Sequence, residues 1–152
     1  LGDVYKRQGS EFKGFFKDEF TTLEEADDRI MATSLTARWR YNKTDGINFD
    51  EVYEDVKKLC LAAFATTYSR ALQETLHAMG KAVLEAHPEI DEIRFSAPNK
   101  HHFLYDLDRF GIENKGEVFI AADRPYGLIE AQVVRDDASD PGEAWTAVPS
   151  FS

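Results

Sequence analysis

The chain has 152 residues, of which 43% are hydrophobic, which is enough for one ordinary domain with a real core. The net charge of −10 argues against a nucleic-acid partner, whose phosphates would require a basic face. No apolar run has the length of a bilayer span and no signal-peptide pattern is present, so we expect a cytoplasmic protein without a membrane partner. The single cysteine, Cys60, excludes an internal disulfide and is expected to be buried among apolar neighbours.

The two ends of the chain differ in composition from its middle. The run Asp3-Val4-Tyr5-Lys6-Arg7-Gln8 can be back-translated to a transposase adapter used in sequencing libraries, so residues 1–8 are expected to be read-through outside the fold. The alternative is a genuine short N-terminal arm. The domain is therefore expected at residues 9–135. Asp, Ser, Pro and Gly accumulate over residues 136–152, which predicts an irregular tail whose aromatic residues, Trp145 and Phe151, are available to dock on a neighbouring surface.

The first predicted elements are a short helix, a strand and a long helix. Thr22 followed by Glu25 has the form of a capping box, which predicts a short helix that opens at this point. Alternating apolar and polar residues over 35–41 predict a half-buried strand. Apolar residues then recur every three or four positions over 49–64, which predicts a long amphipathic helix.

A second helix and two more strands follow. The second helix is expected to be capped by Ser69 and to end near His87-Pro88. Strands are predicted over residues 92–107 and 117–135, the latter interrupted by a turn or bulge where Pro125 and Gly127 occur. This order predicts an α+β fold in which two helices cover one face of an antiparallel sheet.

Two polar side chains interrupt an apolar row in the first of these late strands. Asn99 and His101 share the parity of Ile93, so they are expected on one side of the strand unless Pro98 introduces a bulge. A buried amide or imidazole needs a partner, because leaving it unpaired costs roughly 1–3 kcal/mol. That partner can be a protein group, which would make the pair structural, or a ligand. Adjacent His101 and His102 point to opposite faces and no other ligand spacing completes a site, so no metal is expected.

Six separated motifs occur in a characteristic order, namely Gly9-Ser10-Glu11-Phe12-Lys13-Gly14-Phe15, Phe20-Thr21-Thr22-Leu23, Asp28-Arg29, Ala71-Leu72-Gln73-Glu74-Thr75, Pro98-Asn99-Lys100-His101-His102-Phe103 and Ala121-Ala122-Asp123-Arg124-Pro125-Tyr126-Gly127-Leu128-Ile129. Together they resemble the urate oxidase (uricase) family, in its bacterial branch. The resemblance covers about residues 9–135 and only the C-terminal half of that family's chain. It implies a tunnelling fold (T-fold) built from two strands, two helices and two strands, with the first strand largely truncated here.

The resemblance also implies a site for urate, a planar anionic purine. Such a ligand is suited by a flat cation, a bidentate amide and an aromatic face. Arg29, Gln73 and Phe12 supply these three groups and match the family's urate-binding residues. Without the resemblance, Arg29 would be read as a surface helix residue, Gln73 as a solvated side chain and Phe12 as part of the core.

The start of the second helix adds a backbone donor. With Ser69 as N-cap, Leu72 lies at the third helical position, where the N–H has no intrahelical acceptor and the helix dipole favours an anion. The resemblance assigns this N–H to a urate oxygen, at a position where the family usually has a smaller aliphatic side chain. The alternative is an ordinary capped helix start.

By resemblance, Asn99 positions dioxygen or the water that replaces it, and His101 belongs to a proton relay with a Thr and a Lys. That Thr and Lys lie in the family's N-terminal half, on an adjacent subunit, so the resemblance implies a homo-oligomer, a tetramer for the full-length parent. The implied reaction converts urate, dioxygen and water into 5-hydroxyisourate and hydrogen peroxide without a cofactor.

Two functions of different classes follow from these observations. The first is that of a fragment of a cofactor-free urate oxidase, inactive on its own because the relay partners are missing. The second is that of a non-catalytic purine- or pterin-binding module of the same fold. If the resemblance is set aside, the chain reads as an acidic α+β assembly domain whose polar strand residues are structural.

Overall fold

A computed structural model describes residues 3–22, 24–122, 124–146 and 148. In chain order, its elements are β1 (Asp3–Lys6), β2 (Met31–Ser34), β3 (Thr36–Tyr41), α1 (Phe49–Thr66), α2 (Leu72–Ala86), β4 (Ile90–Asn99), β5 (His102–Leu104), the 3-10 turn η1 (Asp108–Phe110), β6 (Phe119–Ala121) and β7 (Gly127–Val134). Within these residues, no helix is both long enough and apolar enough to cross a membrane.

The strands pair antiparallel in three sheets, of which the three-stranded one has β4 at its centre and a small one consists of β5 and β6. β3 and β7 pair with β4 on either side, and β1 pairs with β2. Only Leu35 separates β2 from β3, and Ala32 of β2 bridges Lys100 just beyond β4, so β2 and β3 are successive halves of one bent strand. The predicted α+β class, with two helices and antiparallel strands, is confirmed.

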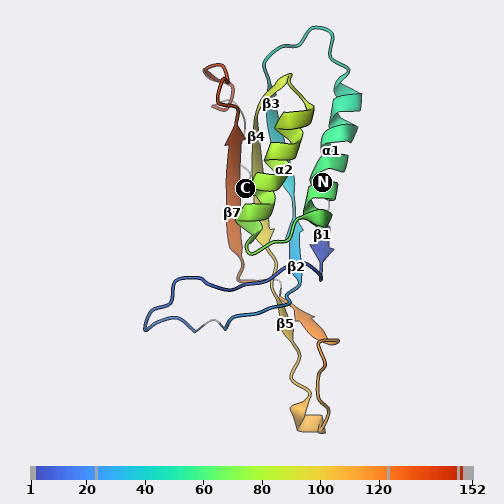
Figure 1. Cartoon of the computed structure of the whole chain (residues 1–152), viewed down its shortest axis with the longest axis vertical. Helices are drawn as coiled ribbons and strands as arrows, with labels where there is room; N and C mark the ends of the chain where they lie inside the picture. Colours follow the sequence, from blue (N-terminus) through green and yellow to red (C-terminus); the bar gives the residue numbers. More distant parts are fainter. Residues whose placement is uncertain (1–2, 23, 123, 147, 149–152) are drawn as a thin grey trace.

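Both helices lie on the same face of the sheet (Figure 1). The strand register places Trp39, Ile93 and Val133 side by side across β3, β4 and β7. The Trp39 ring lies 6.2 Å from the ring of Tyr53 in α1, centroid to centroid. In α2, a Cβ built on Gly80 would lie 2.7 Å from the Val133 Cβ atom. Helix α1 therefore covers β3, and α2 packs against β4 and β7.

The core lies between this helical layer and the sheet. Its buried side chains are Met31, Leu35, Val52, Val56, Cys60, Phe64, Leu72, Leu76, Met79, Val83, Leu84, Ile90, Ile93, Phe95 and Ala97. Cys60 is fully buried, as the sequence predicts, and burial raises the pKa of its thiol to about 12. The thiol is therefore protonated and acts as a small apolar group at neutral pH.

The short helix predicted at Thr22 is wrong for the described residues. The chain there forms turns and bends, and Ala26 makes an isolated antiparallel bridge with Phe12. The two residues exchange backbone hydrogen bonds of 2.8 and 3.0 Å, so the Ala26 amide is committed to a distant strand-like partner rather than to a helix. Leu23, inside the predicted capping box, lies outside the described residues.

Ser69 is not the N-cap of α2, contrary to the sequence prediction. Ala71 holds that position without a side-chain cap, so Leu72 is the first helical residue rather than the third. Ser69 instead pairs with the segment around Ser10, accepting a hydrogen bond from the Glu11 N–H and donating its own N–H to the Gly9 carbonyl. This extended pairing takes the backbone of Ser69 out of reach of the helix start.

The first residues of the chain also depart from expectation. The prediction that residues 1–8 form no folded element is wrong for the described part, because Asp3–Lys6 forms β1 and pairs residue by residue with β2. Alternate side chains of β1 are half-buried, and Val4 packs against the core. The prediction that these residues are not part of the natural protein stays a prediction.

The two late strands are each divided. The strand predicted over residues 92–107 consists of β4 and β5, which Lys100 and His101 separate. The register between β4 and β7 runs without a shift from Glu92 through Asn99, so Pro98 introduces no bulge in that ladder. The strand predicted over residues 117–135 is divided into β6 and β7, as the Pro and Gly signals indicate.

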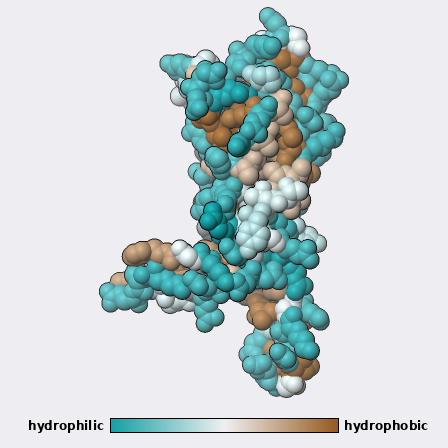
Figure 2. Space-filling view, in the orientation of Figure 1, coloured by the Kyte–Doolittle hydropathy of each residue, from teal (hydrophilic) through white to brown (hydrophobic). Residues whose placement is uncertain are grey.

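Two segments project from the sheet and carry exposed aromatic and aliphatic side chains (Figures 1 and 2). One is the loop between β1 and β2, where Phe16 and Phe20 are 87% and 81% exposed. The other is the arm formed by β5, η1 and β6, with Phe103 and Phe110 exposed. Apolar side chains exposed to this degree indicate contact surfaces rather than core.

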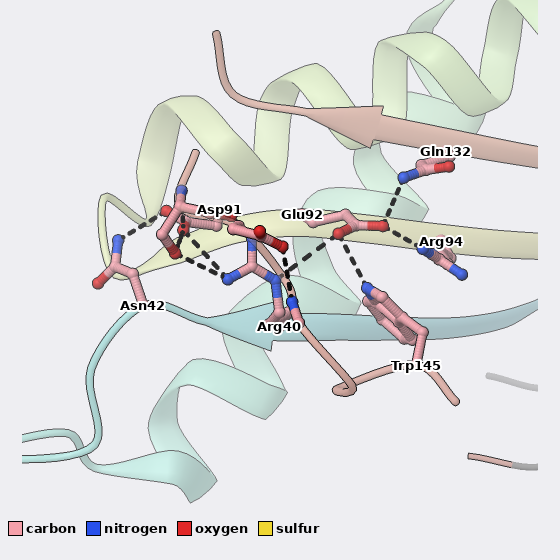
Figure 3. A network of polar contacts seen from close by, with 10 residues as sticks. Arg40, Asn42, Asp91, Glu92, Arg94, Gln132 and Trp145 are labelled. Carbon is pink, nitrogen blue, oxygen red and sulfur yellow. Dashed lines mark hydrogen bonds and ion pairs between the residues drawn. The ribbon is translucent and has the colours of Figure 1, made fainter. Parts of the chain in front are cut away.

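On the face opposite the helices, Glu92 is the centre of a polar network (Figure 3). Glu92 is 1% exposed, and its carboxylate accepts hydrogen bonds from Arg94 Nε at 2.6 Å, Gln132 Nε2 at 2.6 Å and Trp145 Nε1 at 2.9 Å. The Arg94 guanidinium also lies 4.0 Å from the centroid of the Trp145 ring. The predicted docking of Trp145 is confirmed, whereas Phe151 lies outside the described residues.

Asp91 is a second buried carboxylate of this network. It accepts hydrogen bonds from the Asn42 side-chain amide at 2.9 Å and from the Ser139 hydroxyl at 2.8 Å, and Arg40 Nη1 lies 3.3 Å from it. Burial alone raises the pKa of Asp91, but these donors and the charge of Arg40 outweigh it, so the pKa is lowered from its ordinary value of 3.8. The ionised carboxylate is thus the form that the fold stabilises.

We expect Gly80→Ala to destabilise the fold by about 1–3 kcal/mol, because a methyl group at this position overlaps Val133 and cannot be accommodated without moving α2 from the sheet. The measurement is the free energy of unfolding in urea. Gly127→Ala is the matched control, since its Cβ would meet nothing closer than Ile129 Cδ1 at 4.0 Å. Equal losses for the two variants would contradict the close packing of α2.

We expect the chain to associate with itself through the outer edge of β3. Among the described residues, β3 pairs only with β4, so its other side presents unpaired N–H and C=O groups. We expect oligomers or aggregates at roughly tens of micromolar protein by light scattering, because a bare edge templates pairing. The exposed Thr36 lies on this edge, and Thr36→Lys should reduce the association. A stable monomer would contradict this prediction.

We expect the folded chain to lose stability in acid because Asp91 becomes protonated there. Its folded-state pKa is lowered, so its contribution is present above the unfolded-state value of about 4 and is lost as the pH falls through the folded-state value. Asp91→Asn should lower the free energy of unfolding near neutral pH and flatten its decrease in acid, measured by urea unfolding over a pH series. Asp45→Asn, in an exposed loop, is the control and should leave the pH profile unchanged.

Candidate functional site

Arg29 is the centre of a cluster of side chains beside the start of α2. Its Nε atom donates a hydrogen bond of 3.0 Å to the Ser10 hydroxyl, and its backbone N–H donates to the Ser10 carbonyl at 3.1 Å. The guanidinium carbon lies 5.4 Å from the centroid of the Phe12 ring. Nη2 is buried and has no hydrogen-bond partner among the described residues. We call Ser10, Phe12, Arg29 and Ser69 the arginine cluster.

Backbone pairing brings the three chain segments of the arginine cluster together. The bridge between Phe12 and Ala26 holds the two ends of the projecting loop side by side, which brings Arg29 next to Ser10. A parallel bridge between Ser10 and Ser69 then attaches both to the segment that precedes α2. The cluster is thus built on paired backbone rather than on a free loop.

The start of α2 is buried on one side and is held by side-chain hydrogen bonds. The Ser69 hydroxyl donates to the Ala71 carbonyl at 2.8 Å and accepts from the Thr75 hydroxyl at 2.8 Å. The Leu72 side chain is buried in the core, whereas Gln73 is exposed. As the first two helical residues, Leu72 and Gln73 have backbone N–H groups without an intrahelical acceptor, so the backbone of Leu72 and the side chain of Gln73 are the groups available to a ligand.

The electrostatics around Arg29 favour an anion. Burial lowers the pKa of Arg29 from its ordinary value, yet a guanidinium stays charged in proteins. The pKa of Lys6 is also lowered, first by burial and then by the charge of Arg29, so two cations lie near each other here. The Lys6 ammonium donates to the Thr67 carbonyl just before the Ser69 segment. In a chain of net charge −10, this local positive charge distinguishes the site.

Phe12 does not offer both of its faces. The Phe15 ring stacks on it with centroids 4.3 Å apart and planes inclined by 18°. An aromatic ligand that stacks on Phe12 therefore has to use the remaining surface of that ring or displace Phe15. Phe15 belongs to the projecting loop between β1 and β2, whereas Phe12 is held by its bridge to Ala26.

Asn99 and His101 lie at the end of β4, next to β2, whose Ala32 bridges Lys100. Asn99 is the last residue of β4, opposite Gly127 in β7, and both Asn99 and His101 are half-buried. His101 follows the end of β4, where its carbonyl accepts a hydrogen bond from the Ala122 N–H at 2.9 Å, and its ring lies 6.0 Å from that of Phe103. Within the described part of the chain, no hydrogen bond or ring contact joins either side chain to Arg29.

The structure thus brings Phe12, Arg29 and the start of α2 together, and places Asn99 and His101 at a neighbouring strand end. Sequence reasoning missed Ser10 and Thr75 as the partners of Arg29 and Ser69, and gave Ser69 a capping role. The only signal for them is their position inside motifs already singled out, since an isolated serine or threonine predicts no particular contact. Over the described ranges, no group of three or more His, Cys, Asp or Glu side chains is arranged to hold a metal ion.

The fold and the site define an α+β protein of the T-fold type with a cation-lined site at the start of its second helix. The uricase family model matches residues 3–130. The uricase of Arthrobacter globiformis is 55% identical over 148 residues, which are 97% of this chain and 49% of that relative. The uricase of Dictyostelium discoideum is 41% identical, over 87% of this chain and 46% of that relative.

Solved structures give the same result. The crystal structure of Arthrobacter globiformis uricase superposes with a TM-score of 0.90 at 57% identity, covering 95% of this chain and 50% of that one. A mutant urate oxidase from Bacillus sp. TB-90 superposes with a TM-score of 0.76 at 25% identity, covering 88% of this chain and 45% of that one. The chain belongs to the uricase family, and it spans about half the length of these relatives.

Proposed function

We propose that this chain is the urate-holding part of a cofactor-free urate oxidase. The proposed parent enzyme converts urate, dioxygen and water into 5-hydroxyisourate and hydrogen peroxide. The observation that carries the proposal is the buried Nη2 atom of Arg29, which has no partner among the described residues, in a cluster that also holds an aromatic ring. A buried donor without an acceptor is costly, and a bound anion with two acceptors would relieve that cost.

Urate fits the chemistry of this cluster. Its planar ring suits the surface of Phe12, and its charge and edge acceptors suit the fork of Arg29. The Gln73 side chain, which is exposed beside the cluster, offers both a donor and an acceptor to a purine edge. The free N–H of Leu72 adds a donor near the positive end of the α2 dipole. Family membership supports this choice of ligand over other planar anions.

Asn99 and His101 are proposed to serve the reacting side of urate. Asn99 would hold dioxygen or the water that replaces it, and His101 would pass a proton, which an imidazole can do near neutral pH. The family's Lys and Thr partners of this histidine would come from the other half of a full-length chain on an adjacent subunit. The site is therefore proposed to be complete only in a homo-oligomer, a tetramer in the parent enzyme.

The chain alone is expected to consume no urate. A positioned general base typically contributes about 10²–10⁴ in rate, and the partners proposed to make His101 such a base belong to the other half of a full-length chain. Activity should appear when the preceding half of Arthrobacter globiformis uricase is joined to residues 9–152. The measurement is the loss of urate absorbance in the ultraviolet together with peroxide formation.

The control for this experiment is the same fusion carrying His101→Ala, which should retain urate binding and lose most of its turnover. If the fusion binds urate but does not consume it, the result favours the alternative, a non-catalytic purine-binding module. Turnover by the chain alone that is sensitive to His101→Ala would overturn the proposed dependence on a second half.

In the active fusion, Arg29→Ala should weaken urate binding by about 3 kcal/mol, because it removes a bidentate, charge-assisted partner from a buried anion. Binding is measured by titration calorimetry without dioxygen. Arg109→Ala is the matched control, since Arg109 lies in the exposed η1 turn and its contacts among the described residues are with Tyr105 and Phe110 of the arm. Equal effects of the two substitutions would remove Arg29 from the site.

A further inference from the structure

We propose that Ser10 is the positioning residue for Arg29, holding its guanidinium with the two terminal nitrogens directed to the ligand. The proposal rests on the proposed function, because it concerns how the same site receives urate. Ser10 would touch Arg29 and not the ligand, so its role differs from those of Phe12, Gln73 and Asn99.

The Ser10 hydroxyl lies at the Nε edge of the Arg29 guanidinium. It is 1% exposed, and its oxygen accepts the hydrogen bond of 3.0 Å from Arg29 Nε. A guanidinium has five N–H donors in a fixed plane, one on Nε and four on the two terminal nitrogens. Because Ser10 takes the Nε donor, rotation about the last side-chain bonds of Arg29 is restricted and the terminal nitrogens stay free for an acceptor pair. The buried, unpartnered Nη2 atom is one of these nitrogens.

Ser10 also fixes the backbone of Arg29. The Ser10 carbonyl accepts the Arg29 N–H at 3.1 Å, so one residue holds both the beginning and the end of the arginine side chain. The same residue bridges to Ser69, whose hydroxyl is bonded to Ala71 and Thr75 at the start of α2. Ser10 thereby sets the position of Arg29 relative to the Leu72 N–H and the Gln73 side chain.

In this arrangement the long side chain of Arg29 is already ordered before a ligand binds. Arginine has many rotamers, and a ligand that had to select one of them would bind more weakly. Phe12 lies against the guanidinium at 5.4 Å but cannot set its rotation, since a ring face offers no directional acceptor. In the described cluster, the Ser10 hydroxyl is the side-chain acceptor bonded to Arg29, so it is the group whose removal should release the guanidinium.

The first experiment needs no urate. In the 152-residue chain labelled with nitrogen-15 and carrying Thr36→Lys to limit association at the β3 edge, the Arg29 Nε–H proton should exchange slowly with water, because it is buried and hydrogen-bonded. Ser10→Ala should speed this exchange by about tenfold or more, and Ser10→Thr, which keeps the hydroxyl, should restore slow exchange. Ser139→Ala is the matched control. It removes a serine hydroxyl that accepts a bond of the same 3.0 Å length from Arg40 Nη1, far from the cluster.

The second experiment uses the active fusion and separates positioning from stability. Ser10→Ala should raise the urate dissociation constant and KM about tenfold, with little change in kcat, while Ser10→Thr recovers most of the affinity and Ser139→Ala changes neither. A general loss of stability would lower the active fraction, and so the apparent kcat, without this specific change in KM.

The outcomes are distinct. Unchanged exchange of the Arg29 Nε–H proton in Ser10→Ala overturns the inference, whatever the enzyme does. Faster exchange with an unchanged urate KM also overturns it, and leaves the proposed function standing. If the fusion with the native sequence neither binds nor oxidises urate, the proposed function fails, and the exchange experiment alone then decides whether Ser10 holds Arg29.

Discussion

The central position of β4 is the constraint on which the rest of the structure depends. Its helix-facing residues Ile93 and Phe95 are fully buried under α1 and α2, while the alternate residue Glu92 is buried on the opposite face under Trp145. A strand that is buried on both faces and paired on both edges cannot shift its register without exposing apolar groups and stranding charges. The position of Asn99 at the end of β4 follows directly from that fixed register.

The two faces of β4 stabilise the fold by different means. On the helical side the contact is so close that α2 requires a glycine at position 80, which makes packing sensitive to one methyl group. On the other side, Glu92 is compensated by Arg94, Gln132 and Trp145, so the charge is buried without being left unpaired. Through Trp145, the tail is therefore part of the sheet's polar face, while residues 136–146 form only turns and irregular structure, as their composition predicts.

Local patterns predicted the helices well, because α1 and α2 are specified by residues that lie three and four positions apart on one helix. They failed where pairing is long-range. Thr22 and Glu25 satisfy the local rule for a helix start, yet the bridge from Phe12 to Ala26 takes the backbone that the helix would need. Ser69 is a good cap by type, and its true role depends on Ser10, which is distant in the sequence.

For the candidate site, too, the sequence indicated the residues but not the long-range contacts between them. The resemblance identified Phe12, Arg29, Leu72 and Gln73 by type and order, and in the structure the bridge between Ser10 and Ser69 links the segments of Phe12 and Arg29 to the start of α2. What sequence could not supply is the geometry, because the rotation of Arg29 depends on a hydroxyl contact and the available face of Phe12 depends on whether Phe15 covers it. A buried guanidinium with an unpaired nitrogen is costly to a fold that gains nothing from it. The proposed urate site gives this costly arrangement a role, because an anion bound beside Arg29 would supply the missing acceptor.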